Sequence, residues 1–298
     1  PTSAKRAADL MKFKSIWTQI ANRFIDHPAE LIFEVVNEPY FELNDDEMDF
    51  INLMIIDVIR STGGNNSNRS IIITGGGANS YQAPSTIGDE VLNYDANLIA
   101  SFHYYIPFNF TASSQEQYND FNWGTNADKS TLDSHFDFVK NWSETNNIPV
   151  TLGEFAADNE SGYNYNTGLY GNNGGPVSAD RIEYHRYIAE QAIDRGFSFS
   201  AWCAGNKSTK TIHLRTDNPE TNNIYPGVWV EEVKDALLSH GEWPTCYGPY
   251  NDEIIRNPDF ECGISSQWSF SVLGSAEASL TETENVVYSG QTAAKIDV

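Results

Sequence analysis

Short hydrophobic segments alternate with amphipathic segments along most of this chain, and the alternation restricts the possible folds more than any other feature. The hydrophobic segments are rich in branched residues and cover residues 31–36, 70–74, 98–104, 150–154 and 198–202. Strands that are hydrophobic on both faces are typical of parallel sheets. The alternation therefore predicts an α/β fold in which a parallel sheet is covered by helices or closed into a barrel.

The segments between these strands carry the periodicity and the end signals of helices. Asn44 is placed to cap one helix, with Glu47 three residues later as in a capping box. Ser178 is placed to cap a second helix over residues 179–195. Three further helices are predicted over residues 7–24, 132–144 and 229–240.

A change of sequence texture near residue 246 divides the chain. We predict an α/β domain over residues 1–246, a turn-rich linker over 247–256 and an incomplete β-sandwich over 257–298. The last part has short alternating segments without a helical period, over residues 268–272, 276–280 and 293–298. Such segments are typical of antiparallel sheets.

Charge and composition exclude several classes of partner. The formal net charge of −23 repels phosphate backbones and anionic lipids, so we expect neither a nucleic-acid partner nor a membrane partner. The chain has no glycine-rich phosphate loop, and the spacing of its three cysteines matches no metal-ligand pattern, so we expect no cofactor and no metal. An aromatic content of 13% suits stacking on a neutral sugar, although most large aromatic side chains are core residues.

Polar side chains follow several of the predicted strands. Glu38 and Glu154 lie at the ends of two of them, while His103 and Tyr105 share one face at the end of a third. Each alone is more often a solvated charge or a satisfied buried ring. Two carboxyl groups at matching strand ends, however, are what glycoside hydrolysis needs: an acid for the leaving oxygen and a nucleophile or base opposite it. A separation of about 5 to 5.5 Å would predict retention of configuration, and one near 8 Å inversion.

Four features in this order resemble glycoside hydrolase family 5, over roughly residues 7–240. They are Asn37-Glu38-Pro39, His103-x-Tyr105, Gly153-Glu154-Phe155 and Trp202, each at the end of a predicted strand. Within the family, the residues around Phe102 and Ile16 look most like those of bacterial endo-β-1,4-glucanases. The resemblance implies a (β/α)8 TIM barrel, a retaining mechanism, a β-linked polysaccharide as substrate and a secreted protein.

The same resemblance implies a role for each matching residue. Glu38 would be the acid and base and Glu154 the nucleophile. The other residues would contact the substrate or support the two glutamates: Asn37 at the 2-hydroxyl, His103 and Tyr105 beside the carboxylates, Trp202 beneath the sugar and Trp123 at an adjoining subsite.

One departure from the family pattern and one further resemblance lead to additional expectations. Family members place three strands before Asn-Glu-Pro, whereas this sequence has about thirty residues there that read as one helix. We therefore expect a barrel without its first three strands and a homo-oligomer that covers the exposed flank. Residues 257–298 resemble the beginning of a jelly-roll carbohydrate-binding module.

Several functions remain open at this point. The main interpretation is a retaining endo-β-1,4-glucanase that forms a covalent glycosyl-enzyme. One alternative is a sugar-binding or assembly protein derived from such an enzyme and catalytically impaired. Another is a β-mannanase or mixed-linkage glucanase of the same family.

Overall fold

The computed structural model describes residues 3–28, 30–39, 43–215, 227–240, 279–283 and 293–297. The chain divides into two compact units, Pro1–Gly241 and Glu242–Val298. In the second unit, β10 (Ser279–Thr283) pairs antiparallel with β11 (Ala293–Asp297). The predicted linker, the strand predicted at 268–272, Cys246 and Cys262 lie outside the described residues, so the linker and the β-sandwich stay predictions.

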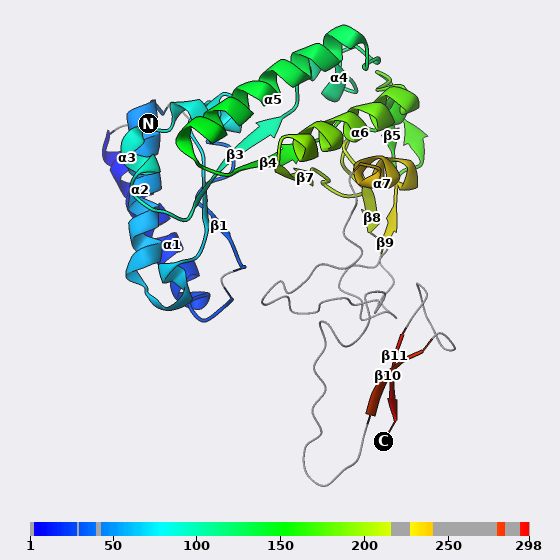
Figure 1. Ribbon diagram of the computed structural model, residues 1–298. Coiled ribbons are helices and arrows are strands. Elements are labelled where there is room, and N and C mark those ends of the chain that lie inside the picture. The colour runs from blue at the N-terminus through cyan, green and yellow to red at the C-terminus, as the bar shows by residue number, and fades with distance from the viewer. Residues whose placement is uncertain are drawn as a thin grey trace. The chain divides into compact units, whose positions relative to one another are not determined.

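A parallel five-stranded sheet forms the centre of the first unit. Its strands pair in chain order: β1 (Phe33–Glu34), β2 (Ile71–Ile73), β3 (Leu98–Tyr104), β4 (Val150–Phe155) and β7 (Ser198–Ala201). Every neighbouring pair is parallel. The long helices lie along the outer side of this sheet (Figure 1). This is the arrangement of part of a (β/α)8 barrel, and it confirms the predicted fold class.

Five longer helices accompany the sheet: α1 (Ser3–Arg23), α2 (Asp45–Ser61), α5 (Asn126–Asn146), α6 (Ser178–Asp194) and α7 (Glu231–Leu238). No helix among the described residues combines the length and hydrophobicity needed to cross a membrane. The smaller elements lie in the connections: the short helices α3 (Asp89–Leu92) and α4 (Phe108–Thr111), and the hairpins of β5 (Tyr163–Asn164) with β6 (Leu169–Tyr170) and of β8 (His213–Arg215) with β9 (Gly227–Trp229).

The predicted helix starts meet different outcomes. The capping box of α2 is confirmed, because Asn44 Oδ1 accepts from the Glu47 N–H at 2.9 Å and Glu47 Oε2 accepts from the Asn44 N–H at 3.1 Å. The prediction that Ser178 caps α6 is wrong: the helix begins at Ser178, and Val177 precedes it without a side-chain cap. The helix predicted over 229–240 begins later, since Trp229 pairs with His213 in the β8–β9 hairpin.

Alternation along β1 separates a core face from a polar face. Phe33 and Val35 are buried against α1, where the Trp17 ring meets Phe33 edge-on at 5.6 Å and Trp17 Nε1 donates to the Val35 carbonyl at 3.1 Å. Glu34 therefore points to the opposite face of the strand. Glu38 follows four residues after Glu34, and its carboxyl group lies beside His103.

The fully buried Arg69, just before β2, holds the segment that leads into β1. Its guanidinium donates to four backbone carbonyls of that segment: Phe24 (3.1 Å), His27 (2.8 Å), Pro28 (2.6 Å) and Leu31 (2.5 Å). It also lies over the Phe33 ring, 4.8 Å from the centroid. Burial lowers the pKa of Arg69 below its usual value. The guanidinium N–H groups replace the hydrogen bonds that these buried carbonyls would make with water in the unfolded chain.

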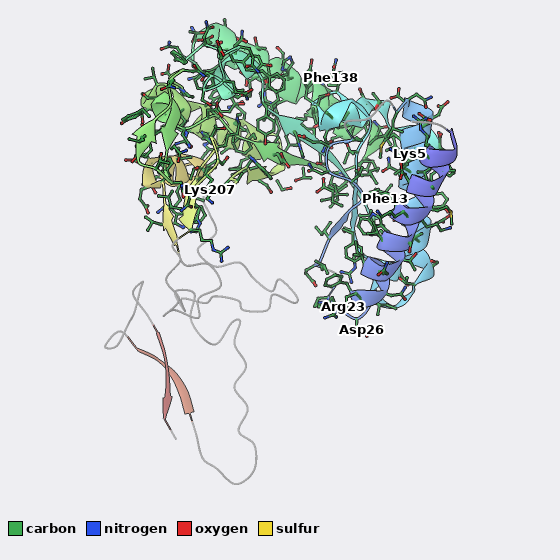
Figure 2. All side chains as sticks on the ribbon, turned by 180° about the vertical axis from the view of Figure 1, so that it is seen from behind. Lys5, Phe13, Arg23, Asp26, Phe138 and Lys207 are labelled. Atoms are coloured by element: carbon green, nitrogen blue, oxygen red, sulfur yellow. The ribbon has the colours of Figure 1, made fainter. Side chains whose placement is uncertain are left out.

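Replacing Arg69 by Lys should lower the free energy of unfolding by about 2 to 4 kcal/mol, because an ammonium lacks the planar fork and leaves buried carbonyls without donors. Urea denaturation measures this loss. Arg23→Lys is the matched control, since Arg23 is exposed at the end of α1 (Figure 2) and should change stability by no more than about 0.5 kcal/mol. Equal stability of the two variants would contradict the role given to Arg69.

Candidate active site

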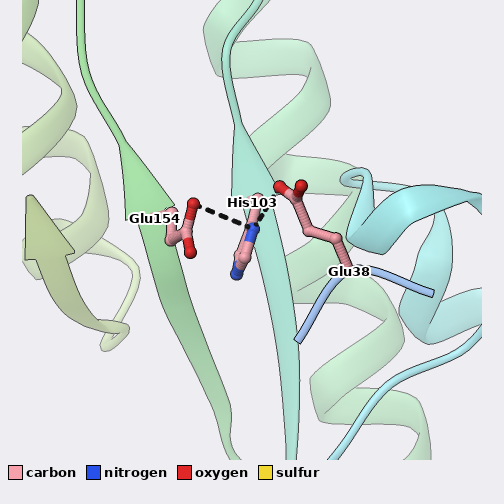
Figure 3. Close-up of side chains that lie close together, drawn as sticks. All are labelled: Glu38, His103 and Glu154. Carbon is pink, nitrogen blue, oxygen red and sulfur yellow. Dashed lines mark hydrogen bonds and ion pairs between the residues drawn. The ribbon is translucent and has the colours of Figure 1, made fainter. Parts of the chain in front are cut away.

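Glu38, His103 and Glu154 meet at the carboxyl end of the parallel sheet (Figure 3). His103 Nδ1 lies 2.8 Å from Glu38 Oε1 and 3.5 Å from Glu154 Oε2. Carboxylates only accept hydrogen bonds, so Nδ1 carries the ring hydrogen and directs its N–H toward both carboxylates. One oxygen of Glu38 lies within 4.8 Å of an oxygen of Glu154. The two acids, 116 positions apart in sequence numbering, thus face a common space.

A bulge in β4 turns Glu154 toward His103. Phe102 pairs with Leu152, but the next two pairs are His103 with Glu154 and Tyr104 with Phe155, so Gly153 is an extra residue. Without this shift, strict alternation would place Glu154 on the same face as Leu152, which packs in the core. The bulge reverses the direction in which the Glu154 side chain points.

Gly153 is the residue that this bulge requires. A Cβ atom at this position would lie 2.8 Å from Ser101 Oγ and 2.9 Å from His103 Nε2. Both distances are shorter than real Cβ contacts, so any larger residue would displace the imidazole or the strand. The missing side chain leaves the space that His103 occupies.

Two further residues hold Glu154. Tyr105 Oη donates to Glu154 Oε2 at 2.9 Å. With the Asn37 amide oriented to suit both neighbours, its NH2 donates to Glu154 Oε1 at 3.1 Å and its oxygen accepts from the Glu38 N–H at 3.2 Å. Burial and the adjacent Glu154 raise the pKa of Tyr105 above its usual value, so the phenol stays protonated and donates.

The two carboxyl groups differ in exposure. The side chain of Glu38 is 37% exposed, that of Glu154 is 15% exposed and the His103 ring between them is 3% exposed. Donors on both oxygens fix the orientation of Glu154, whereas Glu38 is open to water. This arrangement suits a nucleophile at Glu154 and a proton donor and acceptor at Glu38.

Glu34 also belongs to this group, since its carboxyl group interacts with both His103 and Glu154. Burial is the main cause that raises the pKa of the Glu34 carboxyl, and Glu154 adds to the rise. His103 and a hydrogen bond with Ser101 act in the opposite direction. The sequence pattern could have indicated Glu34, because it lies two residues before Val36 and four before Glu38, and period-2 alternation places such residues on one face.

The two predicted tryptophans occupy different environments. Trp202 follows β7 and is 41% exposed, while its backbone N–H donates to the Phe155 carbonyl at 2.9 Å. Trp123 is only 5% exposed and meets the Tyr184 ring edge-on at 5.1 Å. Because the Trp123 ring lies in the core, it offers no open face to a sugar. This placement corrects the expectation that it lines an adjoining subsite.

Two clusters of the described residues carry the donor types of a metal site. One is Glu38, His103 and Glu154, and the other is Glu190, Asp194 and His240. In the first, the Tyr105 hydroxyl and the Asn37 amide already donate to Glu154 and would compete with a cation for its lone pairs. The geometry therefore favours proton transfer and nucleophilic attack over metal coordination.

Comparisons with known proteins agree with this geometry. The model of the family "Cellulase (glycosyl hydrolase family 5)" matches residues 1–208. Endoglucanase H of Acetivibrio thermocellus is 34% identical over 241 residues, which are 80% of this chain and 23% of that protein. Endoglucanase B of Clostridium cellulovorans is 32% identical over 218 residues, which are 69% of this chain and 46% of that protein. The chain thus spans less than half the length of these curated relatives.

Solved structures give a similar result. An endoglucanase structure with 28% identity has a TM-score of 0.60 and covers 76% of this chain and 65% of its own. A broad-specificity endoglucanase from Clostridium acetobutylicum with 27% identity has a TM-score of 0.61 and covers 80% of this chain and 68% of its own.

Replacing Gly153 by Ala should lower glycoside hydrolase turnover by about 10- to 100-fold, because the new methyl group displaces His103 from the two carboxylates. Steady-state kinetics measure the loss, and thermal unfolding checks that the fold persists. Gly76→Ala is the matched control: this glycine follows β2, has a φ of −73°, and its Cβ would meet nothing closer than 3.6 Å. Normal turnover in Gly153→Ala would contradict the close approach described here.

Proposed function

This chain belongs to glycosyl hydrolase family 5, the cellulase family, and on that premise we propose that it is a retaining endo-β-1,4-glucanase acting on cellulose or related β-glucans. The observation that carries the proposal is the approach of a Glu38 oxygen to within 4.8 Å of a Glu154 oxygen. Retaining glycosidases hold their carboxyl groups about 5 to 5.5 Å apart, whereas inverting enzymes leave about 6.5 to 9.5 Å for a water molecule.

The first step of the proposed reaction breaks the glycosidic bond. A Glu154 oxygen attacks the anomeric carbon and forms an ester with it, while Glu38 transfers its proton to the departing glycosidic oxygen. The bond between that carbon and oxygen breaks, and the released chain leaves with the proton. The donors from Tyr105 and Asn37 keep the attacking carboxylate oriented throughout.

The second step returns the enzyme to its starting state. Glu38, now a carboxylate, accepts a proton from a water molecule as that water attacks the anomeric carbon. The ester to Glu154 breaks, and its electrons return to the carboxylate. The greater exposure of Glu38 supports this role, because water must reach it and not the shielded Glu154.

The remaining residues position the substrate and the two acids. His103 donates between Glu38 and Glu154 and keeps their distance fixed. Asn37 lies against Glu154, where a sugar 2-hydroxyl would meet it, and the exposed Trp202 offers a ring face beneath that sugar. The donors to both oxygens of Glu154 support catalysis over a protein that only binds sugar. No contact among the described residues favours a mannan over a glucan.

We also propose an extracellular location, because cellulose is an insoluble polymer that reaches the enzyme outside the cell. The named relatives are bacterial endoglucanases. The predicted homo-oligomer remains a prediction, which the mass of the chain in solution tests.

Replacing Glu154 by Gln should lower kcat on a soluble β-glucan by about three orders of magnitude or more, because an amide of the same shape cannot form the glycosyl ester. Reducing-end release measures turnover. Glu144→Gln is the matched control, since this side chain on α5 is 66% exposed and lies 3.7 Å from Lys140 in a weak ion pair. Hydrolysis at the normal rate by Glu154→Gln would end the assignment.

Replacing Tyr105 by Phe should lower kcat by about 10- to 100-fold, because the Glu154 carboxylate loses the hydrogen bond that orients Oε2 for attack. Steady-state kinetics on a soluble β-glucan measure the loss. Tyr94→Phe provides the control: Tyr94 donates to Asp57 in a similar tyrosine–carboxylate pair that is exposed on the surface. An unchanged kcat in Tyr105→Phe would show that this hydroxyl does not act on the reacting carboxylate.

A further inference from the structure

A cavity of about 270 Å³ lies between the β5–β6 hairpin and the segment that follows Trp202. Its walls include Tyr163 and Tyr170 from the hairpin and Lys207, Ser208 and Thr209 from the segment. The volume is close to the lower end of the range of small-molecule pockets, about 300 to 1,000 Å³. The cavity is therefore suited to one or two sugar rings.

Both walls of this cavity belong to connections that leave the active-site edge of the sheet. The hairpin lies in the connection after β4, whose end carries Glu154, and the opposite wall follows β7 and Trp202. The two connections are joined directly, because the Asn159 N–H donates to the Thr209 carbonyl at 2.5 Å. Asn159 is only five residues after Glu154, so the cavity lies on the same side of the sheet as the carboxylates.

The buried Asn159 makes the floor of the cavity rigid. Its side chain is 1% exposed and donates to the carbonyls of Tyr163 (2.9 Å) and Ser208 (3.0 Å), one from each wall. Its oxygen accepts from the Thr211 N–H at 2.8 Å and from the buried Arg181 at 3.3 Å. A site held in this way needs little ordering when a ligand binds.

The lining combines aromatic rings with hydroxyl groups. Tyr163 and Tyr170 are partners across the hairpin, with ring centroids 5.1 Å apart. Tyr170 and its neighbour Leu169 are each 66% exposed, which is unusual for two adjacent large side chains on a short hairpin. The hydroxyls of Ser208 and Thr209 belong to the facing segment. A pyranose ring presents an apolar face to aromatic rings and a rim of hydroxyls to polar groups, so its chemistry matches this lining.

From these observations we propose that the cavity is a distal subsite, in which the β5–β6 hairpin binds a neutral glucose unit of the same β-glucan chain that is cleaved at Glu38 and Glu154. The proposal rests on the proposed function. Its consequence is a preference for longer chains: a substrate long enough to reach the hairpin gains contacts that a short one cannot make. The gain is in binding, so it affects KM and leaves the chemical step unchanged.

The test compares Tyr170→Ala with the wild type on linear β-1,4-gluco-oligosaccharides of increasing length. We expect KM for the longest chains to rise about three- to tenfold with unchanged kcat, and kinetics on the shortest hydrolysed chain to stay the same. Lys207→Gln, on the opposite wall, should also raise KM for the longest chains. Phe138→Ala is the control, because Phe138 is an exposed ring on α5 in a different part of the unit (Figure 2).

The outcomes separate this inference from the proposed function. If the wild type hydrolyses the oligosaccharides and Tyr170→Ala has the same KM as the wild type at every chain length, the distal subsite is overturned. The glucanase assignment then still stands. An effect confined to branched glucans would also overturn it, since a side-branch sugar and not the main chain would then fill the cavity. If the wild type does not hydrolyse the oligosaccharides, the glucanase assignment fails. Calorimetry with the longest oligosaccharide then tests the distal subsite by itself. Weaker binding by Tyr170→Ala than by the wild type supports the subsite, and equal binding overturns it.

Discussion

The one-residue register shift between β3 and β4 is the constraint on which the site depends. Parallel pairing aligns Phe102 with Leu152 in the core, and the extra residue Gly153 then lets His103 face Glu154 across the same pair of strands. The core face keeps its sequence of large side chains, because Tyr104 and Phe155 are again partners one step later. The bulge therefore changes one polar contact without disturbing the packing beneath it, which is how a close-packed sheet accommodates a functional group.

Different parts of the core hold the two acids, and His103 connects them. Glu154 is the next-to-last residue of β4, a central strand with neighbours on both sides. Glu38 follows β1, a strand of two residues whose approach from α1 is fixed by the buried Arg69 fork. A short strand alone would position a side chain poorly. The guanidinium supplies the missing rigidity through backbone carbonyls, and the bond from His103 then sets the final distance between the carboxyl groups.

Local signals predicted the elements and several contacts, and the failures have physical causes. The strand at 98–104 and the capping box at Asn44 depend on nearby residues, and both are as predicted. Alternation also placed His103 and Tyr105 at the end of that strand, but it gave no sign that β4 contains a bulge. Gly153 looked like an ordinary strand glycine because its role depends on an imidazole fifty positions earlier in the sequence. The prediction for Trp123 has a similar limit, because tertiary packing decides whether an aromatic ring faces solvent. Here the Trp123 ring packs against Tyr184.

Unequal exposure of the two carboxyl groups follows from this construction and fits the proposed two-step reaction. A glycosyl ester must survive until the first product leaves, which requires that water reach the anomeric carbon only along the side of the base. Glu154 has donors on both oxygens and a buried ring beside it, so unguided water has little access there. Glu38 has its contact with His103 on one side and solvent on the other. The same asymmetry lets one residue serve as acid and then as base, because a proton donor that must be restored between steps has to remain in contact with water.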